Sequence, residues 1–541
     1  MKQGATDVGE IMIETEAEQR QRQIEEIDAK KTKLDFRKIP LDDKATWDLI
    51  GTGYTKGIFQ LEGNLGKRYA REIKPRNMNE LSDLISLIRP GCLEAEFREK
   101  DNEPGKFSSI THTYIKVKNG EWKPEYPDEC LEPIFRNTYS VPVYQEQAMS
   151  ICSEFAGFNL KEADFARKII GKKKPEQLGE LKEKFILGAA NNCKSKELAE
   201  FVFGWLEKFS GYLFNKSHGI SYAVIAYRTA YAKANYPLQF FKAMLANSDS
   251  KQDSLEEIQE LVHESRLFGI DIRPPCLKNL NSDFDILDNK SIAFGLGHIK
   301  GVGASSLRSL KRISDSKDDI DFLRKAFAEE TKVNKGVVVA LIKSGALDYI
   351  SSRRVRLLWW YKLFCELTER ERNFMYEQLD IVGATLNKSL ENLLESSVPN
   401  KARKPKIKLV IDDITRELGG TPKKMCIAWE KFYLGIPLSG SLVDLYYNPR
   451  VNIQLKNFGR LSDKTSGCIG VVIESIKKIK DKNHNEMCFL TVSDATYMTD
   501  SIVVFSSTYR NLGWIIEEGK PVLITGRKDR DSFLVRKIEH L

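Results

Sequence analysis

The stretch from 161 to 237 constrains the fold most, because two helical patterns lie close together in it. In the second pattern, small and aromatic residues recur at three- and four-residue steps from Ile220 to Ala234. That spacing predicts an amphipathic helix with a small, tightly packing face. Asn215 and Ser217 are both good N-caps for the start of this helix, which places Lys216 and His218 at the positive end of the helix dipole.

The first pattern is basic. Asp164, Lys168 and Lys172 follow one another at four-residue steps, so a helix would place them on one face, with Arg167 beside them. Gly171 would let the lysine triplet at 172–174 leave the helix. Two basic clusters at helix ends indicate a phosphate site, whereas a lysine run alone is more often a solvated helix face.

Together, the two patterns resemble the fingers region of the bacterial replicative polymerases, the DNA polymerase III alpha subunits of family C. That family has the form ADxxRRxxGKKK followed by FNKSHxxxYAxxAYxxAYLKxxYP. The matching residues here are Ala163, Asp164, Arg167, Lys168, Gly171 to Lys174, Phe214 to His218, Tyr222, Ala223, Ala226, Tyr227, Ala230, Tyr231, Lys233, Tyr236 and Pro237.

Further segments resemble the same family. The sequence IFQLEG at 58–63 is similar to its VFQLES, although spacing alone favours a buried strand there. Arg89-Pro90-Gly91 matches the start of its RPGP, with Cys92 at the last position, and residues 144–147 match its YQEQ. An arginine at a rigid turn is suited to gripping phosphate, and a surface capping arginine is the alternative.

The resemblance implies a binding site for the triphosphate of an incoming dNTP, with Gln145 and Tyr222 shaping the pocket. The residues expected in it are Arg89, Gln145, Arg167, Lys168, Lys172, Lys173, Lys174, Lys216, His218 and Tyr222.

A short glycine hairpin follows at 299–303. Gly301 and Gly303 would let backbone N–H groups and Lys300 approach a DNA phosphate, without reading sequence. This looks like a helix-hairpin-helix element, and the stretch at 334–348 resembles a second, weaker copy.

From residue 458 onward the period changes to two, and five short strands with polar turns suggest an OB-fold barrel. On such a barrel Phe489 would stack a base, and Lys477, Lys478 or Arg527 would contact phosphates of a single strand. The alternative is a barrel that only packs against its neighbours.

The peptide from Gln378 to Val382, which reads Gln378, Leu379, Asp380, Ile381 and Val382, resembles motifs that dock into sliding clamps. Its last position is valine where an aromatic residue is usual, and an ordinary amphipathic turn is the alternative.

The composition bounds the remaining possibilities. A net charge of +8 over 541 residues is modest, so nucleic-acid affinity must come from local patches. Nine cysteines without a CxxC pair argue against zinc and for a reducing cytoplasm. The sequence contains no apolar run of about 18 residues, so we expect no membrane span.

These patterns predict a multidomain α+β protein. We expect a polar N-terminal arm at 1–33, a large α-helical fingers domain at 34–285, a helix-hairpin-helix region at 286–350, a helical linker with a basic stretch at 351–457 and the OB-fold barrel at 458–541.

Polymerases of the family transfer nucleotides with two metal ions held by three aspartates of a palm domain. The aspartate pairs at 42–43, 318–319 and 412–413 lie in turns or polar helices and read as solvated or capping residues. We therefore expect no catalytic or metal-binding residue in this chain. The expectation is a split polymerase that binds primer-template DNA and dNTP, while Mg²⁺ is held by a palm on a separate chain.

Such a chain alone should not polymerise. The alternative is a non-catalytic DNA-binding or scaffold protein derived from a broken polymerase gene.

Overall fold

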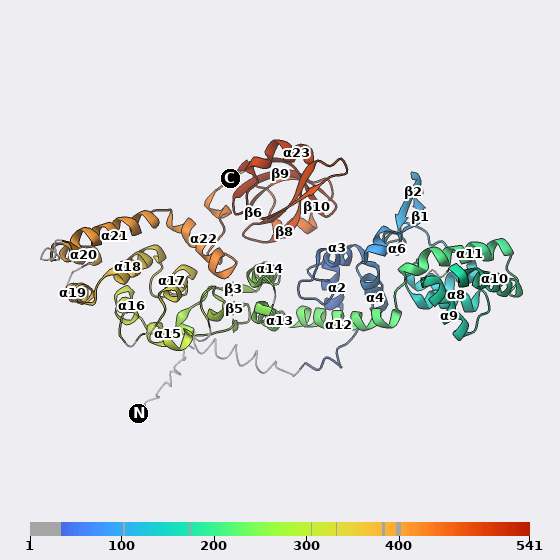
Figure 1. Ribbon diagram of the computed structural model, residues 1–541, viewed down its shortest axis with the longest axis horizontal. Helices are drawn as coiled ribbons and strands as arrows, with labels where there is room; N and C mark the ends of the chain where they lie inside the picture. Colours follow the sequence, from blue (N-terminus) through green and yellow to red (C-terminus); the bar gives the residue numbers. More distant parts are fainter. Residues whose placement is uncertain are drawn as a thin grey trace, which may run out of the picture. The chain divides into compact units, whose positions relative to one another are not determined.

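The computed structural model describes residues 34–100, 103–172, 175–250, 252–303, 306–329, 331, 333–380, 385–396 and 402–541. Residue contacts place Lys33–Pro237 in one compact unit and Leu238–Leu541 in another. Figure 1 labels the helices and strands of both.

The Lys33–Pro237 unit is mainly helical, as expected for a fingers domain. Its helices are α2 (Lys44–Thr52), α3 (Asn64–Ile73), α4 (Met78–Leu87), α5 (Pro90–Glu94), α6 (Ile110–Lys118), α7 (Glu132–Phe135), α8 (Gln145–Glu154), α9 (Leu160–Lys172), α10 (Pro175–Asn191), α11 (Lys196–Phe209) and α12 (Lys216–Asn235). A hairpin of β1 (Glu96–Lys100) and β2 (Glu103–Ser109) precedes α6.

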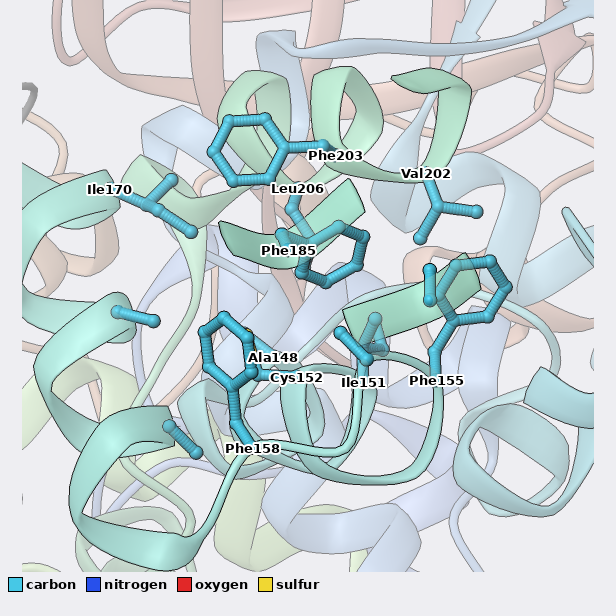
Figure 2. Close-up of a cluster of buried hydrophobic side chains, with 14 of the residues drawn as sticks. Ala148, Ile151, Cys152, Phe155, Phe158, Ile170, Phe185, Val202, Phe203 and Leu206 are labelled. Carbon is cyan, nitrogen blue, oxygen red and sulfur yellow. The ribbon is translucent and has the colours of Figure 1, made fainter. Parts of the chain in front are cut away.

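Helices α8 to α11 surround one apolar core. Figure 2 shows Phe155, Phe185 and Phe203 meeting at its centre, with ring centroids 5.7 Å and 5.4 Å apart along the series. Ile151 and Leu206, from α8 and α11, are buried beside them. This core packs α8 against α9, and these two helices carry four of the ten expected binding residues.

Helix α12 confirms the amphipathic pattern and its cap. The Asn215 side chain accepts a hydrogen bond from the His218 backbone nitrogen at 2.8 Å, which starts the helix at Lys216. Its buried face packs against α4 and α2. At Gly219 the helices α12 and α4 approach so closely that a Cβ atom would lie 2.7 Å from Ser82 Oγ.

The prediction of a buried strand at 58–63 is wrong. The segment forms turns, with Ile58 and Leu61 fully buried at the tip of the loop. Lys233 of α12 is buried beneath this loop, and its Nζ donates to the carbonyls of Tyr54 (3.1 Å) and Lys56 (2.7 Å). Lys233 thus holds the residues that precede the segment, while the N–H groups of Ile58 and Leu61 bond to carbonyls within the loop.

The Leu238–Leu541 unit begins with helices and a small sheet. Its helices are α13 (Pro237–Ala246), α14 (Ser254–Leu267), α15 (Leu307–Ser314), α16 (Asp319–Ala326), α17 (Lys335–Ser344), α18 (Arg354–Glu366), α19 (Glu369–Asp380), α20 (Leu386–Ser396), α21 (Arg403–Glu417) and α22 (Pro422–Leu434). The sheet has the order β3 (Asp271–Arg273), β5 (Ser291–Ala293), β4 (Asp285–Asp288).

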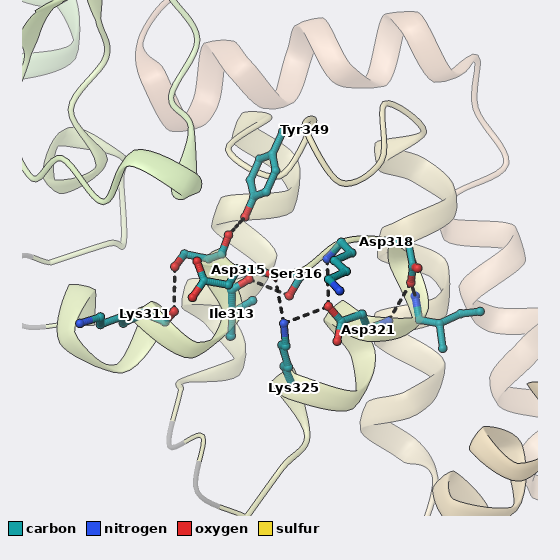
Figure 3. A network of polar contacts seen from close by, with 11 residues as sticks. Lys311, Ile313, Asp315, Ser316, Asp318, Asp321, Lys325 and Tyr349 are labelled. Atoms are coloured by element: carbon teal, nitrogen blue, oxygen red, sulfur yellow. Dashed lines mark hydrogen bonds and ion pairs between the residues drawn. The ribbon is translucent and has the colours of Figure 1, made fainter. Parts of the chain in front are cut away.

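A polar network fixes the turn between α15 and α16. Figure 3 shows Lys325 reaching the Asp315 carbonyl at 3.0 Å and the Asp321 carboxylate at 2.9 Å. Asp318 caps α16 by accepting from the Ile320 and Asp321 nitrogens. The capping role expected for Asp318 is confirmed, and Asp43 caps α2 in the same way through the Thr46 nitrogen.

The chain ends in a closed five-stranded barrel, which confirms the predicted fold class. The strands are β6 (Ser466–Lys480), β7 (Glu486–Ser493), β8 (Met498–Val504), β9 (Pro521–Asp529) and β10 (Ser532–His540), in the order β10-β8-β7-β6-β9. The closing contact between β8 and β10 is parallel and short, with Ile502 opposite Phe533 and Val503 opposite Leu534. Helix α23 (Ser506–Leu512) and a 3₁₀ turn at Gly513–Ile515 connect β8 to β9. Among all described residues, no helix is long and apolar enough to cross a membrane.

Candidate nucleotide-binding site

The N-terminus of α8 joins the two basic clusters that the sequence singles out. Gln145 is the first residue of α8, and its Oε1 accepts from Arg167 Nη1 of α9 at 3.0 Å. The next residue, Glu146, accepts the backbone N–H of Lys216 at the start of α12, with both carboxylate oxygens at 3.1 Å. Neighbouring residues of one helix thus hold the basic patch of α9 and the cationic start of α12 together.

Arg167 is fixed on both sides. Besides Gln145, its guanidinium donates to Asp164 Oδ1 at 3.1 Å and 2.8 Å. Lys168 Nζ lies 2.6 Å from Asp164 Oδ2, and these partners, Lys168 first, lower the pKa of Asp164. The side chain of Lys168 is more than half exposed, so its charge faces solvent. Asp164 therefore orients two cations and stays ionised.

An aromatic row follows α12 from the same end. The rings of Phe214, His218, Tyr222 and Phe59 stand in succession, with centroids 5.4, 4.2 and 5.1 Å apart. Spacing of four residues places His218 and Tyr222 on one face of α12, while Phe214 comes just before the helix and Phe59 from the loop that Lys233 anchors. His218 is exposed and Tyr222 is half-buried, so this row presents flat surfaces beside the cations.

Arg89 is built into this row. Its guanidinium lies 4.3 Å from the centre of the Phe214 ring, and it donates to the carbonyls of Ser86 (2.7 Å) and Tyr212 (3.0 Å). Two of its N–H donors therefore bond to backbone carbonyls, which is the arrangement of a capping arginine.

Beneath the site lies a buried carboxyl that sequence reasoning missed. Asp83 of α4 is 1% exposed and accepts the hydroxyls of Tyr114 (2.8 Å) and Tyr144 (2.6 Å). Burial raises the pKa of Asp83 to about 7, against the opposing effect of the two hydroxyls. The Lys216 ammonium lies 5.7 Å from the centre of the Tyr144 ring, so this carboxyl sits in the second layer below Lys216.

The lysine triplet is described only in part. Lys172 is the last residue of α9, and Lys173 and Lys174 lie outside the described residues. Helix α9 continues through Lys172, so it does not end at Gly171, and the predicted departure of the triplet from the helix is otherwise not described.

The hairpin residues lie in the other unit. Gly301 has a φ of 86°, which favours glycine, and no side chain lies within 4 Å of its Cβ position. Lys300 donates its backbone N–H to the Tyr433 carbonyl at 2.9 Å and rests its ammonium 4.3 Å from the Phe432 ring centre. Gly303 is exposed. A 3₁₀ turn at Leu296–His298 precedes this hairpin. The stretch at 334–348, which resembles a second helix-hairpin-helix copy, contains helix α17.

The barrel brings three of its four expected residues into one row. Cross-strand partners run from Lys477 to Phe489, Val503, Leu534 and Arg527. The side chains on either side of Phe489, those of Cys488 and Leu490, are in the core, so the row faces outward. Lys478 is opposite Cys488 instead, and its ammonium donates to the Tyr509 side chain, which raises the pKa of Lys478.

The clamp-like peptide is helical where it is described. Gln378 and Asp380 end α19, where Gln378 Oε1 accepts from Asn392 at 2.8 Å and Asp380 pairs with Arg324 at 2.6 Å. Ile381 and Val382 lie outside the described residues. Within the part that is described, no three His, Cys, Asp or Glu side chains gather in a way that could hold a metal ion.

A helical fingers unit, a hairpin region and a terminal barrel define the class of a replicative polymerase subunit. Residues 18–193 match the bacterial DNA polymerase III alpha subunit finger domain, and residues 269–357 match the helix-hairpin-helix motif. This chain belongs to the DNA polymerase III alpha-subunit family and corresponds to the C-terminal half of such a subunit.

Relatives in several bacteria support this assignment. The DNA polymerase III subunit alpha of Aquifex aeolicus is 32% identical over 517 residues, which are 93% of this chain and 40% of that protein. The Bacillus subtilis subunit is 31% identical over 519 residues, 94% of this chain and 42% of that protein. The Escherichia coli K12 subunit is 33% identical over 335 residues, 60% of this chain and 27% of that protein. The chain thus spans about two fifths of the first two of these relatives.

Proposed function

We propose that this chain is the fingers and DNA-binding part of a replicative DNA polymerase, and that it binds the incoming dNTP beside the start of α12. The observation that carries the proposal is the pair Gln145 and Glu146. Through Arg167 and the Lys216 nitrogen, these two residues bring the α9 and α12 clusters to one place.

The chemistry of a triphosphate suits this place. Lys168, Arg167 and Lys216 supply cations from two helices, and the α12 N-terminus adds the positive end of its dipole. Cations fixed before the reaction stabilise the charge that develops as pyrophosphate leaves. The exposed ring of His218 and the half-buried ring of Tyr222 form the adjoining wall of the pocket.

The described residues do not fit Mg²⁺, since they offer no cluster of acidic ligands. Our proposal assigns the metal to palm aspartates on a separate chain, and it limits the residues of this chain to binding and orienting the nucleotide. The relatives named above are DNA polymerase III alpha subunits, which supports a nucleotidyltransferase as the assembled enzyme.

The Leu238–Leu541 unit would hold the DNA. Gly301 and Gly303 leave backbone exposed for a duplex phosphate, and the outward row of the barrel suits the template strand. Docking of the 378–382 peptide into a sliding clamp belongs to the same proposal. It requires Gln378 and Asp380 to leave Asn392 and Arg324.

Primer extension on gapped DNA with Mg²⁺ tests the proposal. The purified chain would be compared alone and together with a separately produced palm fragment of the family. Extension only in the mixture, lost in Arg167→Ala and Lys216→Ala but retained in Lys182→Ala, is the expected result. Lys182 is an exposed lysine of α10 and serves as the matched control. Absence of extension in both samples, with DNA binding retained, would favour a scaffold instead.

A further inference from the structure

An open cavity of about 1020 Å³ in the Leu238–Leu541 unit has no place in the function proposed above. The first turns of three helices, α18, α20 and α22, line it, together with residues of the α21 C-terminal end. Its volume is at the upper end of the range for sites that hold one small ligand. Cations and two tryptophan side chains give this cavity a definite chemistry.

Three cations of the lining are unpaired. Arg353, Arg356 and Lys423 are exposed, and within the described part of the chain no hydrogen bond or ion pair engages their side chains. A fourth, Arg354, is different. It is buried, and it donates to Asp348 at 2.7 and 2.6 Å and to Glu430 at 2.6 Å.

The lining carries four cations and the Asp348 carboxylate, and the buried Glu430 carboxylate pairs with Arg354 behind it, so the cluster has a net charge of +2. Cations at the starts of α18 and α22 face the same cavity, and like charges repel each other. Other contacts of the fold must therefore offset this repulsion. The ion pair between Arg354 and Glu430 is such a contact, because it connects the start of α18 to α22. An anion in the cavity would relieve the repulsion.

Backbone N–H groups add to the positive electrostatic potential of the cavity. Neither α18 nor α22 has a side-chain hydrogen bond at its N-cap, whereas α20 is capped by Thr385 through the Lys388 nitrogen at 3.2 Å. Free N–H groups at the starts of two helices of 13 residues favour negative charge beside the unpaired cations.

One aromatic ring in the lining is oriented. Trp359 is half-buried, and its indole nitrogen donates to Thr415 Oγ1 at 3.1 Å. The neighbouring Trp360 ring stands at 80° to it, with centroids 4.7 Å apart, which restricts its rotation further. A fixed indole is a stacking surface for a flat ring. Asn387 and Ser439 provide hydrogen-bonding groups on the same lining.

We propose that this cavity binds a free nucleoside di- or triphosphate. Arg353, Arg356 and Lys423 bind the phosphates, and Trp359 stacks on the base. A phosphate monoester already carries about two negative charges at neutral pH, so the phosphate chain of such a nucleotide has the charge opposite to that of the lining. The proposal does not depend on the dNTP site of the fingers, which lies in the other unit.

Photolabelling of the full chain with 8-azido-ATP tests the proposal. We expect covalent label in peptides that contain 352–360 or 415–426, and competition by ATP and ADP but not by adenosine. The double variant Arg356→Glu/Lys423→Glu should lose at least tenfold of this label. The control Lys404→Glu/Lys408→Glu makes the same charge change on exposed α21 positions outside the lining and should keep it.

Lys216→Ala separates this site from the dNTP site, because it should leave the label at 352–360 unchanged. A folding defect would appear in the far-ultraviolet melting curve, and the single variant Arg353→Gln then replaces the double one. Label that is insensitive to both variants, or that only an oligonucleotide displaces, would overturn the proposal; the second result would assign the cavity to a nucleic-acid strand.

Discussion

The Glu146 carboxylate lies against the backbone nitrogen of Lys216, with each oxygen 3.1 Å away. The positive end of α12 therefore already holds one negative charge, in the place where a phosphate is expected. At the dNTP site proposed above, a triphosphate would have to displace this carboxylate or bind beside it, so we expect Glu146 to oppose nucleotide binding.

Replacing Glu146 by Gln should therefore strengthen dNTP binding. Charges at a helix N-terminus contribute about 0.3–1 kcal/mol, which corresponds to a decrease in Kd of roughly two- to fivefold. Fluorescence titration with a labelled dNTP measures it. Glu154→Gln, at an exposed position on the same helix, should leave Kd unchanged. A weaker complex in Glu146→Gln would mean that the carboxylate supports the site.

The pKa of Asp83 predicts a pH dependence of stability. Burial raises the pKa of this carboxyl from 3.8 to about 7 in the folded protein. The folded state thus holds the proton more tightly than the unfolded state. The stabilising contribution of Asp83 is complete below the unfolded pKa and is lost as the pH rises through about 7.

Thermal unfolding of the wild type and of Asp83→Asn between about pH 5 and about pH 8 tests this. The wild type should lose stability relative to Asp83→Asn as the pH rises. Asp42→Asn, at an exposed position of the same unit, should follow the wild type. Parallel curves for wild type and Asp83→Asn would show that Asp83 is ionised throughout.

The close approach of α12 and α4 predicts a cost at Gly219. A Cβ there would lie 2.7 Å from Ser82 Oγ and 3.1 Å from Ser86 Oγ, so Gly219→Ala must displace these hydroxyls, of which that of Ser82 is hydrogen-bonded to the Tyr144 hydroxyl, or move the helices. We expect it to lower the free energy of unfolding by about 1–3 kcal/mol. Gly204→Ala in α11, with nothing within 4 Å of the new atom, should be neutral or stabilising by up to about 1 kcal/mol. Urea unfolding of both variants gives the comparison, and equal stabilities would contradict it.

The outward row of the barrel predicts that Lys477 contributes to the binding of single-stranded DNA and that Lys478 does not. Lys477 is opposite Phe489 on the outer face, while Lys478 is opposite Cys488 and bonded to Tyr509. For single-stranded DNA we expect Phe489→Ala to cost about 1–3 kcal/mol, and Lys477→Ala to reduce the salt dependence by about one ion. Lys478→Ala, measured in the same salt series by fluorescence anisotropy, is the matched control. Equal effects of the two lysine variants would place the strand elsewhere.

Local rules were sufficient for much of the fold. The Asn215 cap and the spacing from Ile220 to Ala234 predict α12, because both features act within a few residues of each other. The alternating pattern after residue 458 predicts the five strands for the same reason. These elements depend on neighbours in the sequence.

The contacts that assemble the site depend on distant segments. The apolar stripe of α4 is visible in the sequence, yet Ser82, Asp83 and Ser86 on its other side are buried as well. Only the hydroxyls of Tyr114 and Tyr144, from distant segments of the chain, make that burial possible. No local pattern indicates such partners, and the same holds for the Glu146 contact with Lys216.

In the barrel, one irregularity decides which lysine faces outward. Strict alternation from Ile469 would point Lys477 inward and Lys478 outward. The register shift between Ile473 and Ser475 reverses this and places Lys477 beside Phe489. A bulge adds one residue to one strand only, so periodicity in that strand cannot predict it.

The short parallel contact between β8 and β10 has a mechanical consequence. Two residue pairs close the whole barrel there, so this is the join at which the barrel should open first. The outward row from Lys477 to Arg527 crosses that same join through Val503 and Leu534. A nucleic-acid strand bound along the row would contact β8 and β10 on both sides of this join. Its binding should therefore stabilise the closed barrel against opening.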